Sequence, residues 1–423
     1  MIKRLLLGLM VFASLSMEGQ TTLDQCQVAA QKNYPLIRQR DLISRSSDYT
    51  VANIRKGWLP QVSAAAQATL QSDVTAWPDE MRGMMNQMGI DVKGLKKDQY
   101  RIGLDINQNV WDGGAISSQA AVAREQGNVA LAQNEVSLYA VRQRVNEMYF
   151  ALLMLDEQLK LNTDHQQLLD SSEKKLASLY KGGVVSQSDY NTVRAERLAV
   201  VQQHTGLEAQ RRAVAMMLGE LCGINVNEVC KPPVIEVPAT NNRPELQFID
   251  AQLRLAAAQE KSLDAAVMPR LSLFAQGFYG YPGYNMFEDM MHHKFSLNGM
   301  VGARLTWNIG SLYTRHADKA KLQLQRDQVE NNREVFLLNN DMEQIQLNEN
   351  INRFKTMMAA DEEIISLRAS VRKAAESKLS HGIIDVNDLV KEINNENAAR
   401  VQQSLHEIEM LKQIYDLKIS LNN

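Results

Sequence analysis

The chain has 423 residues, and its 46 lysines and arginines nearly balance its 49 acidic residues, which leaves a net charge of −3 at pH 7. This balance argues against a dedicated nucleic-acid-binding protein, which would carry a basic excess. Hydrophobic residues make up 45% and charged residues 22% of the chain, so the composition also excludes a disordered polymer.

The first residues have the pattern of a secretory signal peptide. Met1-Ile2-Lys3-Arg4 is basic, residues 5–16 are mostly apolar, and small residues follow. This apolar stretch is too short to cross a bilayer. We therefore expect residues 1–19 to be a signal peptide, with a buried N-terminal helix as the alternative. Cys26 lacks the preceding small residues of a lipoprotein signal, so we expect no lipid anchor.

Residues that break helices are confined to a few segments. Proline is absent from 79–231 and from 283–423, and glycine is absent from 311–381. Inside a helix, proline costs about 3 kcal/mol and glycine about 1 kcal/mol relative to alanine. The absence of proline from 114–181, and of both residues from 311–380, permits long helices over these two segments, each roughly 100 Å long. Such helices argue against a compact globular enzyme.

The same unit occurs twice in the chain. Trp58-Leu59-Pro60-Gln61-Val62-Ser63 resembles Val267-Met268-Pro269-Arg270-Leu271-Ser272, at an offset of 209 residues. Gly183-Val184-Val185 resembles Gly382-Ile383-Ile384, and Asp189 matches Asp388, both at an offset of 199. The sequence thus predicts a first repeat at 20–221, a linker at 222–241 and a second repeat at 242–423.

Each repeat has the same order of expected elements. A helix (22–58 or 242–267) ends before Pro60 or Pro269, because proline cannot continue a helix and favours an extended predecessor. Two strands follow, and then a long helical hairpin. The return helices are expected at 187–221 and 386–421, after glycine-containing tips at 182–186 and 381–385.

The expected strands alternate strictly between apolar and polar residues. They cover 61–72, 98–111, 270–281 and 295–309, and only the third has its polar face interrupted, by Phe274 and Phe278. One apolar and one wet face also occur in a soluble sandwich, but the length of these strands suits a tilted membrane crossing. Four strands cannot close a barrel, and open edges in lipid are costly. The pattern therefore predicts that copies associate, and three copies would give twelve strands around a water-filled lumen.

At this point the residues resemble the TolC family of outer-membrane efflux proteins. The features that carry the resemblance are Tyr34-Pro35, the two Pro60 and Pro269 segments, Val110-Trp111-Asp112-Gly113-Gly114, and the two glycine tips with their following aspartates. The resemblance covers about 21–421. It implies a mainly α fold with a transmembrane β part, which forms a homotrimer with a twelve-stranded barrel in outer-membrane lipid and a periplasmic helical tunnel.

The same resemblance implies a passive exit duct for efflux or type I secretion. Its partners would be a periplasmic adaptor and an inner-membrane pump. The docking tips would be Gly183, Val184, Val185, Gly382, Ile383 and Ile384. Asp388, with Asp189 as the first-repeat alternative, would narrow the periplasmic entrance, although Lys391 lies one turn further on. The apolar tip residues could instead pack within their own turns.

Other functions are less consistent with the chain. A soluble periplasmic coiled-coil adaptor or scaffold is the alternative, but it would not need four long strands with an apolar face. No phosphate-binding loop or Ser/His/Asp constellation is apparent, so we expect neither an enzyme nor a cofactor, and no nucleic-acid partner.

Two features remain open at this stage. Cys222 and Cys230 lie eight positions apart and could form a disulfide in an exported protein, or remain unpaired thiols. The loops between the strands contain Met81, Met84, Met85 and Met88, and Met286, Met290 and Met291 beside His292-His293. These suit soft metals such as copper or silver, but their helical spacing equally predicts amphipathic turns, and we predict no metal site.

Overall fold

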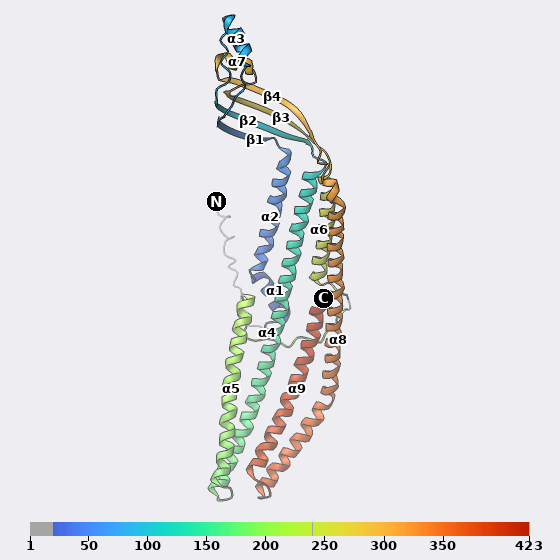
Figure 1. Cartoon of the computed structure of the whole chain (residues 1–423). Coiled ribbons are helices and arrows are strands. Elements are labelled where there is room, and N and C mark those ends of the chain that lie inside the picture. Colours follow the sequence, from blue (N-terminus) through green and yellow to red (C-terminus); the bar gives the residue numbers. More distant parts are fainter. Residues whose placement is uncertain (1–19, 239, 423) are drawn as a thin grey trace, which may run out of the picture. The chain divides into compact units, whose positions relative to one another are not determined.

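The computed structural model describes residues 20–238 and 240–422, so the expected signal peptide lies outside the described residues. The elements follow one another in the order that the two repeats predict (Figure 1). They are α1 (Leu23–Asn33), α2 (Leu36–Arg55), η1 (Lys56–Trp58), β1 (Gln61–Leu70), α3 (Asp79–Gln87), β2 (Asp98–Trp111), α4 (Ala115–Lys181), α5 (Gln187–Cys222), α6 (Pro244–Ala266), β3 (Arg270–Tyr281), α7 (Met286–His292), β4 (Ser296–Thr306), α8 (Ser311–Ser380) and α9 (Val386–Leu421).

The chain forms two compact units that do not coincide with the two repeats. The first, here called the hairpin unit, contains the described residues up to Arg40, Gln133–Gln247 and those from Glu334 onward. The second, the sheet unit, contains Asp41–Ala132 and Phe248–Arg333. Each unit draws on both repeats, because α4 and α8 contribute residues to both. None of the described helices is long and apolar enough to cross a membrane.

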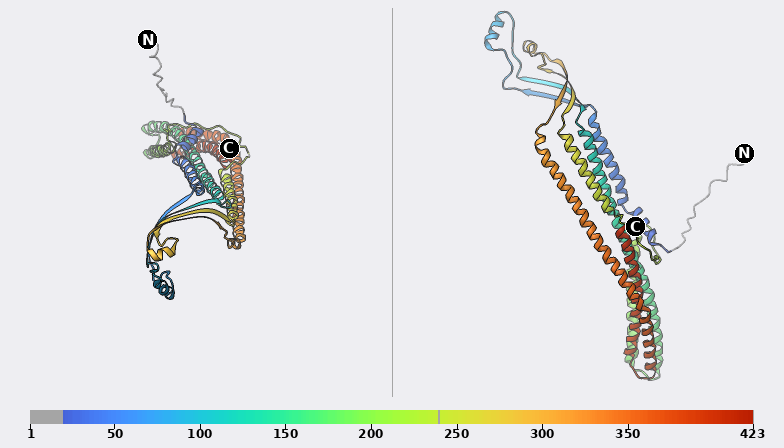
Figure 2. Two further views of the ribbon diagram at one scale, coloured as in Figure 1. Left: turned by 90° about the horizontal axis from the view of Figure 1, so that it is seen from above. Right: turned by 90° about the vertical axis from the view of Figure 1, so that its right-hand side faces the viewer.

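The sheet unit is built on four antiparallel strands in the order β1-β2-β3-β4, which lie side by side in a curved sheet (Figure 2). Their register aligns apolar residues across the whole sheet. Val62 pairs with Ile106, Ile106 with Ala275, and Ala275 with Val301. Because side chains alternate along a strand, residues paired in this way share one face. The predicted apolar face is therefore continuous over all four strands.

The opposite face accommodates the two aromatic residues that interrupt its polar pattern. The guanidinium of Arg101 lies 4.1 Å from the ring centre of Phe278, and that of Arg304 lies 5.0 Å from the ring centre of Phe274. An arginine stacked on an aromatic ring gains cation–π attraction and leaves its charged group accessible to water. The face is thus polar at its surface even where its sequence is aromatic.

Two of the strands are shorter than their periodicity suggests. β1 ends at Leu70, and β4 covers Ser296–Thr306. Trp307 has left the ladder, and its indole N–H donates to the carbonyl of Val267, 3.0 Å away. Pro60 and Pro269 immediately precede β1 and β3, which places them at the expected helix–strand junctions.

The junction from β2 to α4 explains the Asp112-Gly113-Gly114 motif. Asp112 is buried, and its carboxylate accepts hydrogen bonds from the backbone N–H groups of Gly114 (2.9 Å) and Ile116 (2.6 Å). The first N–H groups of a helix have no backbone acceptor within the helix, so the Asp112 carboxylate supplies one and caps α4. Gly113 has φ +67°, and a β-carbon there would collide with Met268.

The hairpin unit contains two main apolar clusters. In the first, α1 packs on α4, α5 and α9 through residues that include Leu23, Tyr149, Leu218 and Leu411. The single helix expected at 22–58 is broken into α1 and α2, because Tyr34 adopts an extended conformation before Pro35. The second cluster joins the hairpins α4–α5 and α8–α9 near their turns.

The structure contains no disulfide among the three cysteines, so the possible Cys222–Cys230 bond is not formed in it, and neither is any other. Cys26, Cys222 and Cys230 are all free thiols. Cys222 is buried at the end of α5, and its thiol donates to the carbonyl of Cys26 at 3.4 Å. The sequence suggested Cys230 because it is close along the chain, whereas folding brings Cys26 to Cys222 across 196 positions.

Candidate functional site

The two long helices α4 and α8 end in the same way at their hairpin turns. Gly183 has φ +69° and Gly382 has φ +72°. The N–H of Val184 bonds to the carbonyl of Leu179, and that of Ile383 to Lys378, at 2.9 and 3.0 Å. The glycine N–H groups bond three residues back, to Tyr180 and Leu379. This is the Schellman pattern, which satisfies the last carbonyls of a helix and requires a left-handed residue.

Replacing Gly183 or Gly382 with alanine should destabilise the respective hairpin by about 1 kcal/mol, because a β-carbon is penalised in the left-handed region. A β-carbon at either position would meet no atom within 4 Å, so packing adds nothing to this cost. Gly206 lies inside α5, and a β-carbon there would also meet no atom within 4 Å. Gly206→Ala should therefore stabilise the folded protein by up to about 1 kcal/mol. Thermal melting followed by helical circular dichroism would separate the two effects. Equal losses at all three positions would contradict the turn argument.

The helices that leave the turns are capped differently in the two repeats. Ser186 and Asp189 form a capping box, in which the Asp189 carboxylate accepts from the backbone N–H of Ser186 (3.0 Å) and from its hydroxyl (2.7 Å). In the second repeat Asp385 is the N-cap, and its carboxylate accepts from the N–H of Asp388 at 2.9 Å. The Asp388 carboxylate is exposed and has no hydrogen bond or ion pair within the part of the chain that the structure describes.

The apolar residues of the tips fall into two kinds. Val184 is 61% and Ile383 is 69% exposed. Val185 and Ile384, one position further on, are partly buried and pack against the cluster that joins the two hairpins. Val184 and Ile383 therefore each expose one apolar side chain at the end of a hairpin, whereas Val185 and Ile384 pack within the hairpin unit.

A groove lies between the two hairpins close to their turns. It has a volume of about 430 Å³ and receives side chains from α4, α8 and α9. Leu176, Leu179, Leu379 and Leu389 supply its apolar lining. The polar lining residues are Ser172, Lys175, Lys373, Glu376, Ser377 and Ser380. The groove was not apparent in the sequence, because it depends on how the two hairpins pack.

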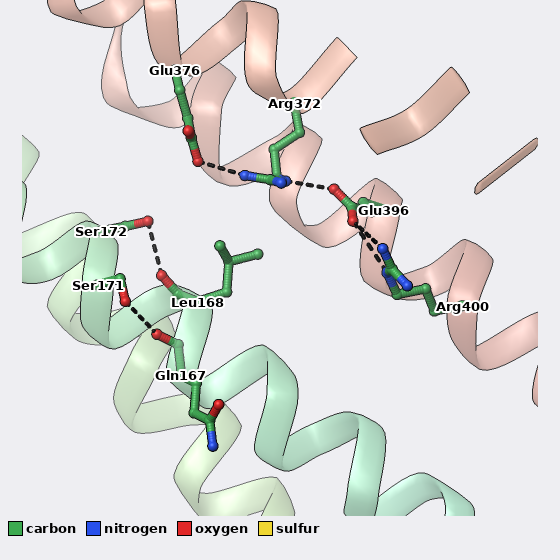
Figure 3. Close-up of polar contacts among 8 residues, drawn as sticks. All are labelled: Gln167, Leu168, Ser171, Ser172, Arg372, Glu376, Glu396 and Arg400. Atoms are coloured by element: carbon green, nitrogen blue, oxygen red, sulfur yellow. Dashed lines mark hydrogen bonds and ion pairs between the residues drawn. The ribbon is translucent and has the colours of Figure 1, made fainter. Parts of the chain in front are cut away.

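Equivalent positions of the two repeats carry the same ion pair with its charges exchanged. In the first hairpin Glu173 of α4 pairs with Arg197 of α5 at 2.5 Å. At an offset of 199 residues, Arg372 of α8 pairs with Glu396 of α9, also at 2.5 Å. Figure 3 shows Arg372 between Glu376 and Glu396, with Arg400 on the other side of Glu396. Each pair ties the two helices of one hairpin together, three to four turns from the tip.

The methionine-rich loops form the short helices α3 and α7. Met290 is buried in a small apolar cluster, and Met85 packs against this cluster. Met84 and Met88 are exposed. His293 bonds through Nε2 to the carbonyl of Gly94 at 2.7 Å. Among the described residues no group of three or more His, Cys, Asp or Glu side chains is placed to hold a metal ion.

Comparison with known proteins agrees with this architecture. Residues 28–223 match the family model of the outer membrane efflux proteins. No curated protein is similar enough to the sequence to count as a match.

Several solved channel structures share the fold over nearly the whole chain. The outer-membrane channel OprN is 16% identical with a TM-score of 0.70, over 94% of this chain and 89% of that one. CmeC of Campylobacter jejuni is 13% identical with a TM-score of 0.67, over 94% and 85%. VceC of Vibrio cholerae is 13% identical with a TM-score of 0.67, over 94% of both chains.

These findings show the fold of the chain and the family that its residues 28–223 resemble. At such identities the solved structures speak for the fold alone, which is mainly helical with one four-stranded antiparallel sheet. The family match confirms the resemblance to the TolC-type outer-membrane efflux proteins. Residues 28–223 are thus similar to the outer membrane efflux proteins, and the whole chain has the fold of the solved outer-membrane channels.

Proposed function

We propose that three copies of the chain form the outer-membrane exit duct of a tripartite efflux or type I secretion system. The sheet supports this proposal most directly. Among the described strands β1 pairs only with β2 and β4 only with β3, so each copy offers two edges. The strands have 10–14 residues, the length of a tilted membrane crossing. In lipid these edges need partners, and three copies of four strands close a barrel of twelve.

The continuous apolar face gives the barrel its lipid-facing side. Ile102, Val301 and Leu305 are exposed in the single chain and share this face. The opposite face, with Arg101 and Arg304, lines a water-filled lumen. The outward faces of bacterial barrels are apolar and their interiors are polar in the same way.

The periplasmic partner is a helical hairpin of an adaptor, which connects the duct to an inner-membrane pump. Val184 and Ile383 are its proposed contacts, because exposed apolar residues rimmed by polar ones commonly mark a partner site. The groove beside them has an apolar lining and a polar rim, which suits the apolar stripe of an amphipathic helix.

Two measurements on intact cells test this assignment. The protein should fractionate with the outer membrane and migrate as a heat-sensitive trimer. A photo-crosslinking residue at position 184 or 383 should capture a periplasmic protein with a coiled-coil hairpin, and the same residue at Met216 of α5 should not. Recovery as a soluble monomer without detergent would favour the scaffold alternative.

We assign the narrowing of the periplasmic entrance to Asp388, because the helices α5 and α9 are capped differently. The Asp189 carboxylate is occupied by Ser186, whereas the Asp388 carboxylate is free to face an incoming ion. In a trimer three copies of Asp388 would converge at the entrance. Asp388→Ala should weaken block of single-channel conductance by divalent cations in planar bilayers. Asp189→Ala should leave the block intact and cost about 1 kcal/mol through its cap. The reverse outcome would assign the gate to the first repeat.

A further inference from the structure

All three cysteines of the chain come together in one place in the hairpin unit. Cys26 lies on α1, Cys222 is the last residue of α5, and Cys230 follows in the next segment. That segment runs beside the start of the chain: the N–H of Thr21 bonds to the carbonyl of Glu228 at 2.8 Å, and that of Cys230 to Thr21 at 3.4 Å. Cys26 and Cys222, from sites far apart in sequence, thus share one apolar cluster, and Cys230 lies next to Tyr149 of that cluster.

Within this cluster Cys26 and Cys222 are neighbours. Their exposed fractions are 0% and 2%, and the thiol of Cys222 lies 3.4 Å from the carbonyl oxygen of Cys26. The sulfur of Cys230 instead lies 3.7 Å from the hydroxyl of Tyr149 and 3.9 Å from the carbonyl of Thr21. Cys26 and Cys222 are therefore the buried neighbours, whereas Cys230 is only partly buried and lies beside Tyr149 and Thr21.

We propose that Cys26 and Cys222 are joined by a disulfide in the exported protein, and that Cys230 remains a thiol. This goes beyond the duct function and does not depend on it. Exported chains pass through an oxidising compartment, where disulfides form and persist. The oxidant is a protein disulfide: its S–S bond breaks, the Sγ–Sγ bond forms, and the two electrons and two protons of the cysteine thiols pass to the oxidant, which leaves as a dithiol.

The burial of the pair determines when the bond forms. Cys26 and Cys222 are 0% and 2% exposed, so a protein oxidant cannot reach their sulfur atoms in the folded cluster. The reaction therefore belongs to folding, before α1 closes over the cluster.

The bond has a structural consequence for the start of the mature chain. α1 has only 11 residues and is separated from α2 by Tyr34-Pro35. A link from Cys26 to the end of α5 closes a loop of 196 positions, and long loops restrict the unfolded chain the most. It would hold α1 in place even when its packing opens.

Peptide mapping tests the pairing directly in the wild-type protein. Free thiols are blocked with N-ethylmaleimide in acid-quenched cells, and the protein is cut with trypsin and a glutamyl endopeptidase. Glu220 and Glu228 flank Cys222 and separate it from Cys230, so each pairing gives a distinct fragment. We expect fragment 221–228 linked to the Cys26 peptide, and Cys230 blocked. Three blocked cysteines, or a link that includes Cys230, would overturn the proposal.

Matched variants give a second readout. Reduction should lower the melting temperature of the wild type and of Cys230→Ser by the same number of degrees. It should have no effect on Cys26→Ala, on Cys222→Ala or on the double variant, which should all melt alike. If Cys230→Ser also loses its response to reduction, the assignment is wrong. If one of the cysteine-to-alanine variants fails to fold, the peptide map of the wild-type protein still decides which cysteines are paired.

Discussion

Replacing Val184 and Ile383 together with aspartate should reduce efflux to the level of cells that lack the protein, while the amount in the outer membrane stays normal. Both side chains are mostly exposed, so a charge there removes little packing from the folded chain. A charge that must be desolvated against an apolar partner surface is costly, because it has no compensating partner there. Each single variant should lose part of the activity, since the two tips are equivalent in the two repeats. Substrate tolerance in cells, with immunoblots of outer-membrane fractions, measures both quantities.

A matched control comes from the first turn of the two helices that follow the tips, α5 and α9. Ser188 and Asn387 occupy equivalent, exposed positions in the two repeats. Ser188→Asp with Asn387→Asp adds the same charge close to the tips without removing an apolar contact. This double variant should retain efflux. Val185 and Ile384 are poorer targets, because they pack against the hairpin cluster and a charge there would also destabilise the fold. Full efflux in the Val184/Ile383 variant would refute tip docking.

Much of the fold could be predicted because it follows from local rules. The absence of proline predicted α4, the absence of both proline and glycine predicted α8, and alternation predicted the four strands. The two strand ends that differed depend on tertiary contacts, such as the bond from Trp307 to Val267. The contact of Cys222 with Cys26 was missed for the same reason, since proximity along the chain says little about proximity in a folded core.

The candidate site could be predicted only in part. Repeat alignment placed both tips, because a left-handed glycine is required wherever a helix ends in this way. The split between exposed Val184 and packed Val185 depends on side-chain direction, which the spacing of the two valines does not reveal. The exchanged ion pair did leave a signal in the sequence. Glu173 and Arg197 stand opposite in charge to Arg372 and Glu396 at the same offset of 199 that relates the tips.

Breaking the Arg372–Glu396 ion pair should have a large effect on stability. Glu396→Ala should destabilise the α8–α9 hairpin by about 3 kcal/mol, the low end for a broken buried ion pair. The side chains of Arg372 and Glu396 are only 14% and 6% exposed, so water can replace little of the lost contact. Arg372→Ala should cost a similar amount, and the double alanine variant should cost clearly less than the sum of the two. Glu376→Ala is the control: it removes only an i,i+4 partner and should cost under about 1 kcal/mol.

The same carboxylate makes the hairpin sensitive to acid. Burial alone would raise the pKa of Glu396, but the hydrogen bonds from Arg372 and Arg400 outweigh it and hold the pKa below its ordinary value of 4.5. A lowered carboxylate pKa stabilises the folded state above the ordinary value, and this stability is lost as the pH falls through the folded-state pKa. The wild-type hairpin should therefore lose stability below about pH 4.5. Glu396→Gln, already lacking the charge, should show a smaller drop over that range. Melting curves of the purified protein at stepwise lower pH would measure this, and identical acid dependence in both proteins would rule out Glu396 as the titrating group.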